Sequence, residues 1–274
     1  MATSPLNIQP SYHSRSNSLP SRQHPLTSQI DENLSRLKAS EAASTSSSIG
    51  NKLNGLKDLH ECVDLLLQLP LTQKALAQEQ HRKWVEELLD GSLMLLDVCS
   101  TAQDALLHTK ECIQELQSIL RRRRAEMGLV NEIRKYLTSR KAMKKAICKD
   151  GENGDVISIL REVEAVTVRV LESLLSFISG PDPESKLCRW SLVSKLMHQK
   201  RVTCEEEEQK TNEIANAEAA LRSFIKSENM KHVENVQNEL QKSDWCIQDL
   251  EEELESLFRR LIKARVTVLN IINC

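Results

Sequence analysis

Residues 233–271 read VENVQNELQKSDWCIQDLEEELESLFRRLIKARVTVLNI, and one face of this stretch is almost entirely apolar. Steps of three and four residues alternate along that face, which is the spacing of a helix that packs lengthwise against another helix. Ser243 is its one polar member. We name this set the C-terminal seam: Val233, Val236, Leu240, Ser243, Ile247, Leu250, Leu254, Leu257, Leu261, Ala264, Val268 and Ile271.

The C-terminal seam predicts one long, coiled-coil-like helix over residues 229–272, on the order of 60 Å in length. Its apolar stripe must be buried, because exposing it to water costs free energy in proportion to its area. An elongated bundle within one chain satisfies this requirement, and so does a coiled coil between two copies. We expect the bundle, since other amphipathic helices are available, with a homo-oligomer as the alternative. The core side chains would be Val236, Leu240, Ile247, Leu250, Leu254, Leu257, Leu261 and Val268.

The composition predicts an all-α protein. Of the 274 residues, 40% are hydrophobic, which is enough for a sizeable core, while only 3% are aromatic and only 7 are glycine. Such a composition favours long helices over sheets. The eight cysteines are scattered without a Cys-x-x-Cys pair, which indicates reduced thiols inside a cell. No stretch reaches the roughly 18 uncharged apolar residues of a transmembrane helix, so we expect no membrane span.

The chain divides into a tail and one helical domain. Residues 1–27 are rich in Ser, Pro and Arg and contain no acidic residue, which predicts a disordered tail. Residues 28–274 form a single elongated helical domain in this interpretation. The expected helices cover 30–42, 49–69, 71–124 with a weak point at Gly91, 127–148, 156 to Gly180, a short stretch within 187–197, and a polar stretch from Glu205 onward.

A second stripe of apolar residues runs through the predicted helix 71–124. Its steps resemble those of the C-terminal seam, which predicts a second helix buried along its length. The members are Leu88, Leu95, Cys99, Ala102, Leu106, Ile113, Leu116 and Leu120.

No motif for catalysis or cofactor binding occurs. The seven histidines lie in unrelated contexts, and neither of the glycine patterns that cradle phosphates is present. His60 and Cys62 are two residues apart, which places them on different helix faces, so we expect a buried Cys62 and an exposed His60 rather than a metal site. The sequence therefore predicts a non-enzymatic protein with no cofactor and no catalytic residue.

The tail carries a candidate phosphorylation site at Ser18. The segment Arg15-Ser16-Asn17-Ser18-Leu19-Pro20 has the layout of a phosphoserine motif for 14-3-3 proteins. Phosphate on Ser18 would add close to two negative charges for an arginine cluster to bind, Arg15 would serve a basophilic kinase, and Pro20 would turn the chain out of the groove. An unmodified Ser-rich tail is the alternative.

Residues 121–149 form a basic segment, with eleven Lys or Arg against two Glu. Such a segment could bind anionic lipid, nucleic acid or a nuclear import receptor. Residues 205–255 contain fifteen acidic residues against five basic ones, so pairing within the chain is an equal alternative. Nucleic acid is the weaker choice, because Tyr136 is the segment's only aromatic residue. The candidate anion-binding residues are Arg121, Arg122, Arg123, Arg124, Arg140, Lys141, Lys144 and Lys145.

Several short blocks are spaced along nearly the whole chain. They include His13-Ser14-Arg15-Ser16, Leu67-Gln68-Leu69-Pro70, Trp84-Val85-Glu86, Leu95-Leu96-Asp97-Val98-Cys99, Trp190-Ser191-Leu192 and Leu257-Phe258-Arg259-Arg260-Leu261-Ile262. Together these blocks resemble the plant family of helical proteins related to BYPASS. The resemblance implies a role in root and shoot development and supplies no catalytic residue.

We therefore expect a non-enzymatic helical protein-interaction module. Its protein partners are not identified by the sequence, apart from 14-3-3 proteins through phosphorylated Ser18. A peripheral membrane or nuclear adaptor that uses the basic segment 121–149 is the alternative function. We expect a cytoplasmic location, with the nucleus as an alternative and chloroplast import left open by the Ser-rich, acid-poor tail.

Overall fold

The structure, a computed structural model, describes residues 24–40, 45–78, 82–122, 126–147, 158–180, 212–227 and 231–273. Every regular element in these ranges is an α-helix, which confirms the all-α prediction for them. The predicted helix within 187–197, the start of the polar helix at Glu205 and residues 1–23 of the tail lie outside the described residues. The helices are α1 (Pro25–Ala39), α2 (Ser46–Leu67), α3 (Pro70–Leu76), α4 (Arg82–Arg121), α5 (Glu126–Ile147), α6 (Ser158–Ser179), α8 (Glu213–Ser227) and α9 (Lys231–Asn273).

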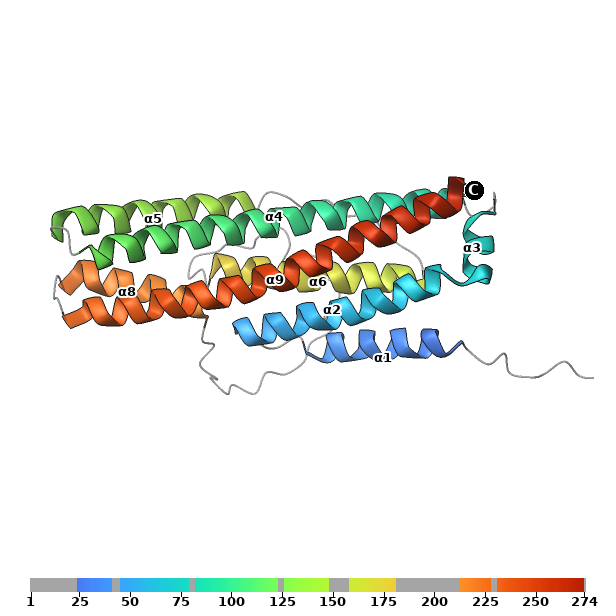
Figure 1. Ribbon diagram of the computed structural model, residues 1–274, viewed down its shortest axis with the longest axis horizontal. Helices are drawn as coiled ribbons and strands as arrows, with labels where there is room; N and C mark the ends of the chain where they lie inside the picture. Colours follow the sequence, from blue (N-terminus) through green and yellow to red (C-terminus); the bar gives the residue numbers. More distant parts are fainter. Residues whose placement is uncertain are drawn as a thin grey trace, which may run out of the picture.

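The described helices form an elongated bundle (Figure 1). α4 and α5 lie along one long edge, and α1 and α2 lie along the other. α9 crosses the bundle diagonally, from α8 at one end to the beginning of α4 at the opposite end. α6 lies behind α9 and packs against α2 and α4.

α9 is the helix that the C-terminal seam predicts. The eight predicted core residues of the seam are at most 4% exposed. The helices that cover them are α2, α4 and α8 of the same chain. The prediction of a bundle within one chain is therefore confirmed for this seam.

Ser243, the polar member of the seam, is also fully buried. Its hydroxyl lies 2.8 Å from the carbonyl oxygen of Glu213 in α8 and 3.0 Å from that of Glu239, one turn back in α9. A buried hydroxyl without such acceptors would cost about 1–3 kcal/mol. Ser243 is therefore tolerated in the core because it has two acceptors.

The apolar stripe of α4 is buried as predicted except at Leu88, which is half-buried, and Cys99, Ala102, Leu106 and Ile113 are fully enclosed. The predicted weak point in this region was misplaced. The helix runs unbroken through Gly91, and the interruption falls between α3 and α4. Pro70 stands at the first position of α3, where its fixed φ and missing N–H suit a helix start.

The first helix begins earlier than predicted, because α1 starts at Pro25 and the sequence predicted a start at residue 30. The ring of His24 accepts a hydrogen bond from the N–H of Leu26 and so caps the helix. At the far end of α6, Gly180 has a φ of 71°, and its N–H donates to the carbonyls of Ser176 and Phe177. A left-handed glycine of this kind ends the helix as the sequence predicted.

Within the described ranges, no helix combines the length and the apolar character needed to cross a membrane.

Candidate functional site

The sequence-predicted sites fall into three groups in the structure. Ser18, Arg15 and Pro20 lie outside the described residues, as do Arg123, Arg124 and the side chains of Lys144 and Lys145. Arg121, Arg122 and Lys141 are exposed. Nine of the twelve residues of the C-terminal seam are buried in the core and offer no surface to a partner, and the other three, Val233, Ala264 and Ile271, are half-buried.

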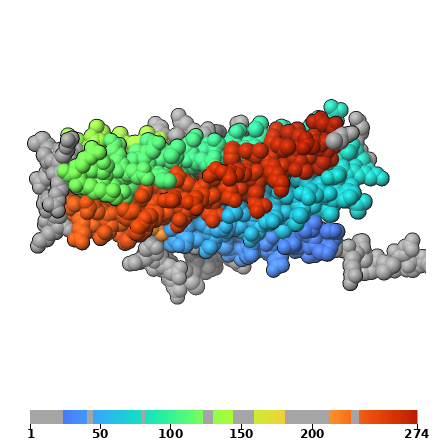
Figure 2. Space-filling view, viewed as in Figure 1, coloured from blue at the N-terminus to red at the C-terminus, as the bar shows by residue number. Residues whose placement is uncertain are grey.

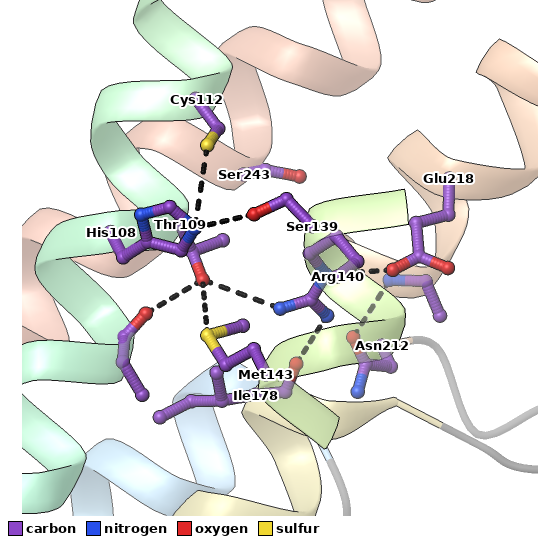
Figure 3. Close-up of polar contacts among 12 residues, drawn as sticks. His108, Thr109, Cys112, Ser139, Arg140, Met143, Ile178, Asn212, Glu218 and Ser243 are labelled. Atoms are coloured by element: carbon purple, nitrogen blue, oxygen red, sulfur yellow. Dashed lines mark hydrogen bonds and ion pairs between the residues drawn. The ribbon is translucent and has the colours of Figure 1, made fainter. Parts of the chain in front are cut away.

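Arg140 corrects the predicted anion-binding patch, because its side chain is only 3% exposed. Its Nε donates to Glu218 Oε1 of α8 at 2.8 Å, its Nη1 donates to Thr109 Oγ1 of α4 at 3.3 Å, and its Nη2 donates to the carbonyl of Ile178 in α6. Figure 3 shows the guanidinium among these partners. A guanidinium with its donors occupied in this way has a structural role and is not available to an external anion.

We call Arg140, Glu218, Thr109 and the carbonyl of Ile178 the Arg140 cluster; it joins four helices. Asn212 lies beside it and donates from Nδ2 to the carbonyl of Phe177 at 2.8 Å. The same residue accepts from the N–H of Ala215 at 2.9 Å, which caps α8. The pairing of α5 with α8 through Arg140 and Glu218 is an instance of the internal pairing between the basic and acidic segments.

A serine and a histidine meet close to the Arg140 cluster. His108 Nε2 lies 2.6 Å from Ser139 Oγ and 3.9 Å from Cys112 Sγ (Figure 3). Activation of a thiol needs a lowered pKa, but burial and the carboxylates of Glu115 and Glu111 raise the pKa of Cys112. The helical backbone N–H groups around the pair are engaged within their own helices, so they cannot stabilise an oxyanion. The group therefore lacks what nucleophilic catalysis requires.

A cavity of about 60 Å³ lies between α2, α4, α6 and α9. We call it the His60 cavity; its walls are mainly Leu and Val side chains, and its polar lining residues are His60, Ser92, Glu164 and Arg265. His60 corrects a prediction, because it is 4% exposed and not on the surface. Burial, with a smaller effect from the charge of Arg260, lowers the pKa of His60 to about 4, so the ring is neutral at pH 7.

The hydrogen bonds of His60 fix its tautomer. Thr167 Oγ1 donates to the carbonyl of Val163 at 2.7 Å, so this hydroxyl has no further proton to give. His60 Nε2 lies 3.0 Å from the same oxygen and must therefore be the donor. The other ring nitrogen, Nδ1, is left as a bare acceptor, and it is buried without a protein partner.

Glu164 enters the His60 cavity from α6. Its carboxylate occupies the space beside Gly91, where a Cβ would lie 2.1 Å from Glu164 Oε1. Glu164 is 8% exposed, and its Oε2 has no protein hydrogen-bond partner. Burial raises the pKa of this carboxyl, although the neighbouring Arg161 acts in the opposite direction. Gly91 thus leaves the space that the Glu164 carboxylate fills, a relation that sequence spacing alone did not reveal.

Apolar side chains also lie on the outer side of the junction between α4 and α9. Arg265 Nη1 donates to Ser92 Oγ at 2.7 Å and to the carbonyl of Leu89, and this fixes the two helices in antiparallel register. Figure 2 shows the second half of α9 lying against the first half of α4 on this face. We call the half-buried and exposed apolar residues here the α4–α9 strip: Leu89, Leu93, Leu96, Phe258, Ile262 and Val266.

The α4–α9 strip has charged edges. Asp90 and Asp97 are exposed on α4, and both lie within one turn of Leu93. On the α9 side, Arg259 and Lys263 are 75% and 62% exposed. One long edge of the strip is therefore acidic, and the other carries two cations together with the exposed carboxylates of Glu252 and Glu255.

Metal ligands do not gather in the part of the chain that the structure describes, since no group of three or more His, Cys, Asp or Glu side chains there could hold an ion.

Comparison with protein-family models finds one family, described as Protein BPS1, which matches residues 52–271. Comparisons with curated proteins and with solved structures find no match.

Proposed function

This chain belongs to the BPS1 family, and on that premise we propose that it is a non-enzymatic interaction protein of plant development that acts as a homodimer through the α4–α9 strip. The observation that carries the proposal is a row of exposed apolar side chains along the junction of α4 and α9. Leu93, Ile262 and Val266 are 48%, 40% and 47% exposed, and the Arg265–Ser92 contact puts Leu93 about level with the other two along the antiparallel pair of helices. Contiguous apolar surface of this kind marks interaction sites on soluble proteins.

The charges at the edges of the strip favour a second copy as the partner. A two-fold axis parallel to the helices would place α9 of one copy over α4 of the other. The edge of each strip that carries Arg259 and Lys263 would then face the acidic edge of its counterpart. The register set by the Arg265–Ser92 contact puts Arg259 about level with Asp97 along the bundle, so these two residues would approach each other across the interface.

The present partner of Arg259 does not prevent this arrangement, whereas Lys263 is paired with the buried carboxylate of Asp64. Arg259 Nη2 lies 2.5 Å from Glu255 Oε1, and Lys263 Nζ lies 3.1 Å from Asp64 Oδ2. Arg259 and Glu255 are both largely exposed, and pairs of this kind contribute only about 0–1 kcal/mol. Arg259 can therefore exchange its partner at low cost when a second copy covers the strip.

Sedimentation velocity across a range of concentrations tests the homodimer. Ile262→Asp should shift the protein to monomer, whereas the control Leu65→Glu, which changes an exposed leucine of α2, should leave the dimer intact. Asp97→Arg and Arg259→Glu should each weaken dimerisation by about tenfold or more, because like charges then meet. The double variant Asp97→Arg/Arg259→Glu should restore it. A monomeric wild type, or a double variant as weak as the single ones, contradicts the proposal.

A second candidate function rests on the exposed part of the basic segment. Arg121, Arg122 and Lys141 are exposed and could bind an anionic membrane surface or an import receptor. Co-sedimentation with vesicles that contain phosphatidylserine tests the membrane form. Binding should fall when Arg121 and Arg122 become Ala and should persist in Lys74→Ala, an exposed control in α3. Equal binding by the wild type, the Arg121→Ala/Arg122→Ala variant and Lys74→Ala excludes this function.

A further inference from the structure

The His60 cavity combines apolar walls with two buried acceptors that have no protein partner. His60 Nδ1 and Glu164 Oε2 are both enclosed, and each belongs to a side chain more than nine-tenths buried. Buried polar atoms normally have a hydrogen-bond partner, either protein or water, because an unpaired one costs about 1–3 kcal/mol. Both residues line the same space. From this geometry we propose that the His60 cavity binds a small, neutral, apolar molecule through a hydroxyl group that donates to His60 Nδ1.

The hydrogen-bonding state of His60 selects a donor. Since Nε2–H is committed to Thr167 Oγ1, the ring can only accept at Nδ1. A ligand that offers only a carbonyl, ether or carboxylate oxygen would place lone pair against lone pair. A hydroxyl group can donate to His60, and its oxygen can still accept a proton from Glu164 when that carboxyl is protonated.

The charges around the cavity select a neutral ligand. Arg265 lines the cavity, and Arg260 lies near enough to His60 to affect it electrostatically. These cations disfavour an ammonium group in the space. The guanidinium of Arg265 is already held by Ser92 Oγ and the Leu89 carbonyl, so it stays at the wall and does not pair with Glu164.

The volume of the cavity limits the size of the ligand. At about 60 Å³ it is several times larger than the roughly 10–15 Å³ that one water molecule needs. It is smaller than the cavities of about 150 Å³ that admit benzene. A body of about two to four non-hydrogen atoms fits the enclosed part, among side chains such as Val63, Leu160 and Val163.

Two probes of equal size test the proposal. 2-Propanol and acetone share the same carbon skeleton, but only 2-propanol can donate a hydrogen bond. In the full-length protein labelled at Val and Leu methyl groups, 2-propanol should give nuclear Overhauser contacts to Val63 and Val163. It should also move the ¹⁵N resonance of His60 Nδ1 in the direction of hydrogen-bond acceptance. Acetone at the same concentration should do neither.

The variant His60→Phe keeps an aromatic ring and removes the acceptor, so it should bind 2-propanol at least about fivefold more weakly. The Nδ1 resonance of the wild type gives the same information if this variant does not fold. Three results would overturn the proposal: equal binding of both probes, which means selection by shape alone; no binding of either probe; or contacts from water only. The homodimer proposed above does not involve His60, Val63 or Val163, the residues that this experiment changes or observes, so each proposal can fail without the other.

Discussion

Replacement of Arg140 by methionine should be among the most destabilising single changes in the described bundle. Methionine keeps much of the length and volume of the side chain but removes the charge and three hydrogen bonds. Glu218 is 9% exposed, so its carboxylate would be left buried, with Arg222 Nη2 at 3.6 Å as its other cation. Loss of one partner from a buried ion pair typically costs about 3–5 kcal/mol, and we expect a loss in that range.

The measurement is urea unfolding at pH 7, followed by circular dichroism at 222 nm. Lys141→Met is the matched control, because it also replaces a cationic side chain by methionine, at the next residue, which is exposed. Its free energy of unfolding should change by no more than about 0.5 kcal/mol. The double variant Arg140→Met/Glu218→Met should recover much of the loss, since removing both charges leaves none unpaired. If Arg140→Met costs no more than Lys141→Met, the guanidinium is not buried against Glu218 and the reasoning is refuted.

Three further changes test other parts of the core. Leu254→Ala should lower the free energy of unfolding by about 2–5 kcal/mol, because this seam residue is fully buried; a loss below 1 kcal/mol by urea titration would be inconsistent with that burial. Gly91→Ala should be destabilising because its Cβ would lie 2.1 Å from Glu164 Oε1, and thermal melts should show a smaller loss in a Glu164→Ala background; equal losses would contradict the contact. His60 has a folded pKa of about 4 against about 6.5 when unfolded, so below pH 6.5 the unfolded chain binds more protons. The contribution of neutral His60 to the free energy of unfolding, up to about 3 kcal/mol, should be present above pH 6.5 and lost as the pH falls toward 4. In urea titrations at each pH, His60→Phe should lack this pH dependence of the free energy of unfolding.

The long helices were predictable because their signals repeat. The three-and-four spacing continues through the whole of α9, so an error at one residue does not change the inference, and α9 differs from the prediction only at its ends. The end of α6 was predictable for a similar reason, because Gly180 is followed by two prolines within three residues. Helix starts were less accurate, since the cap of α1 is His24, a residue that carries little sequence signal for capping.

The polar interior was not predictable from the sequence. Arg140 stands in a run of basic residues, and nothing local distinguishes it from exposed Lys141; only the packing of α5 against α8 and α6 buries it. His60 was expected on the surface because of its spacing from Cys62, and its buried partner Thr167, more than one hundred residues away, gives no local signal. Charge counts over segments indicated that acidic and basic regions could pair. They could not identify Arg140 as a residue that does so in the core.

Isotope-mixed cross-linking tests most directly whether α9 is buried against α4 of its own chain. Lys110 Nζ lies 2.5 Å from Glu251 Oε2, so a zero-length carbodiimide reagent should join them. Equal amounts of ¹⁴N and ¹⁵N protein would be unfolded and refolded together, cross-linked and analysed by mass spectrometry. We expect Lys110–Glu251 linked peptides that are entirely ¹⁴N or entirely ¹⁵N. Hybrid linked peptides as abundant as the pure ones would show that α9 packs on another chain, and would contradict the account.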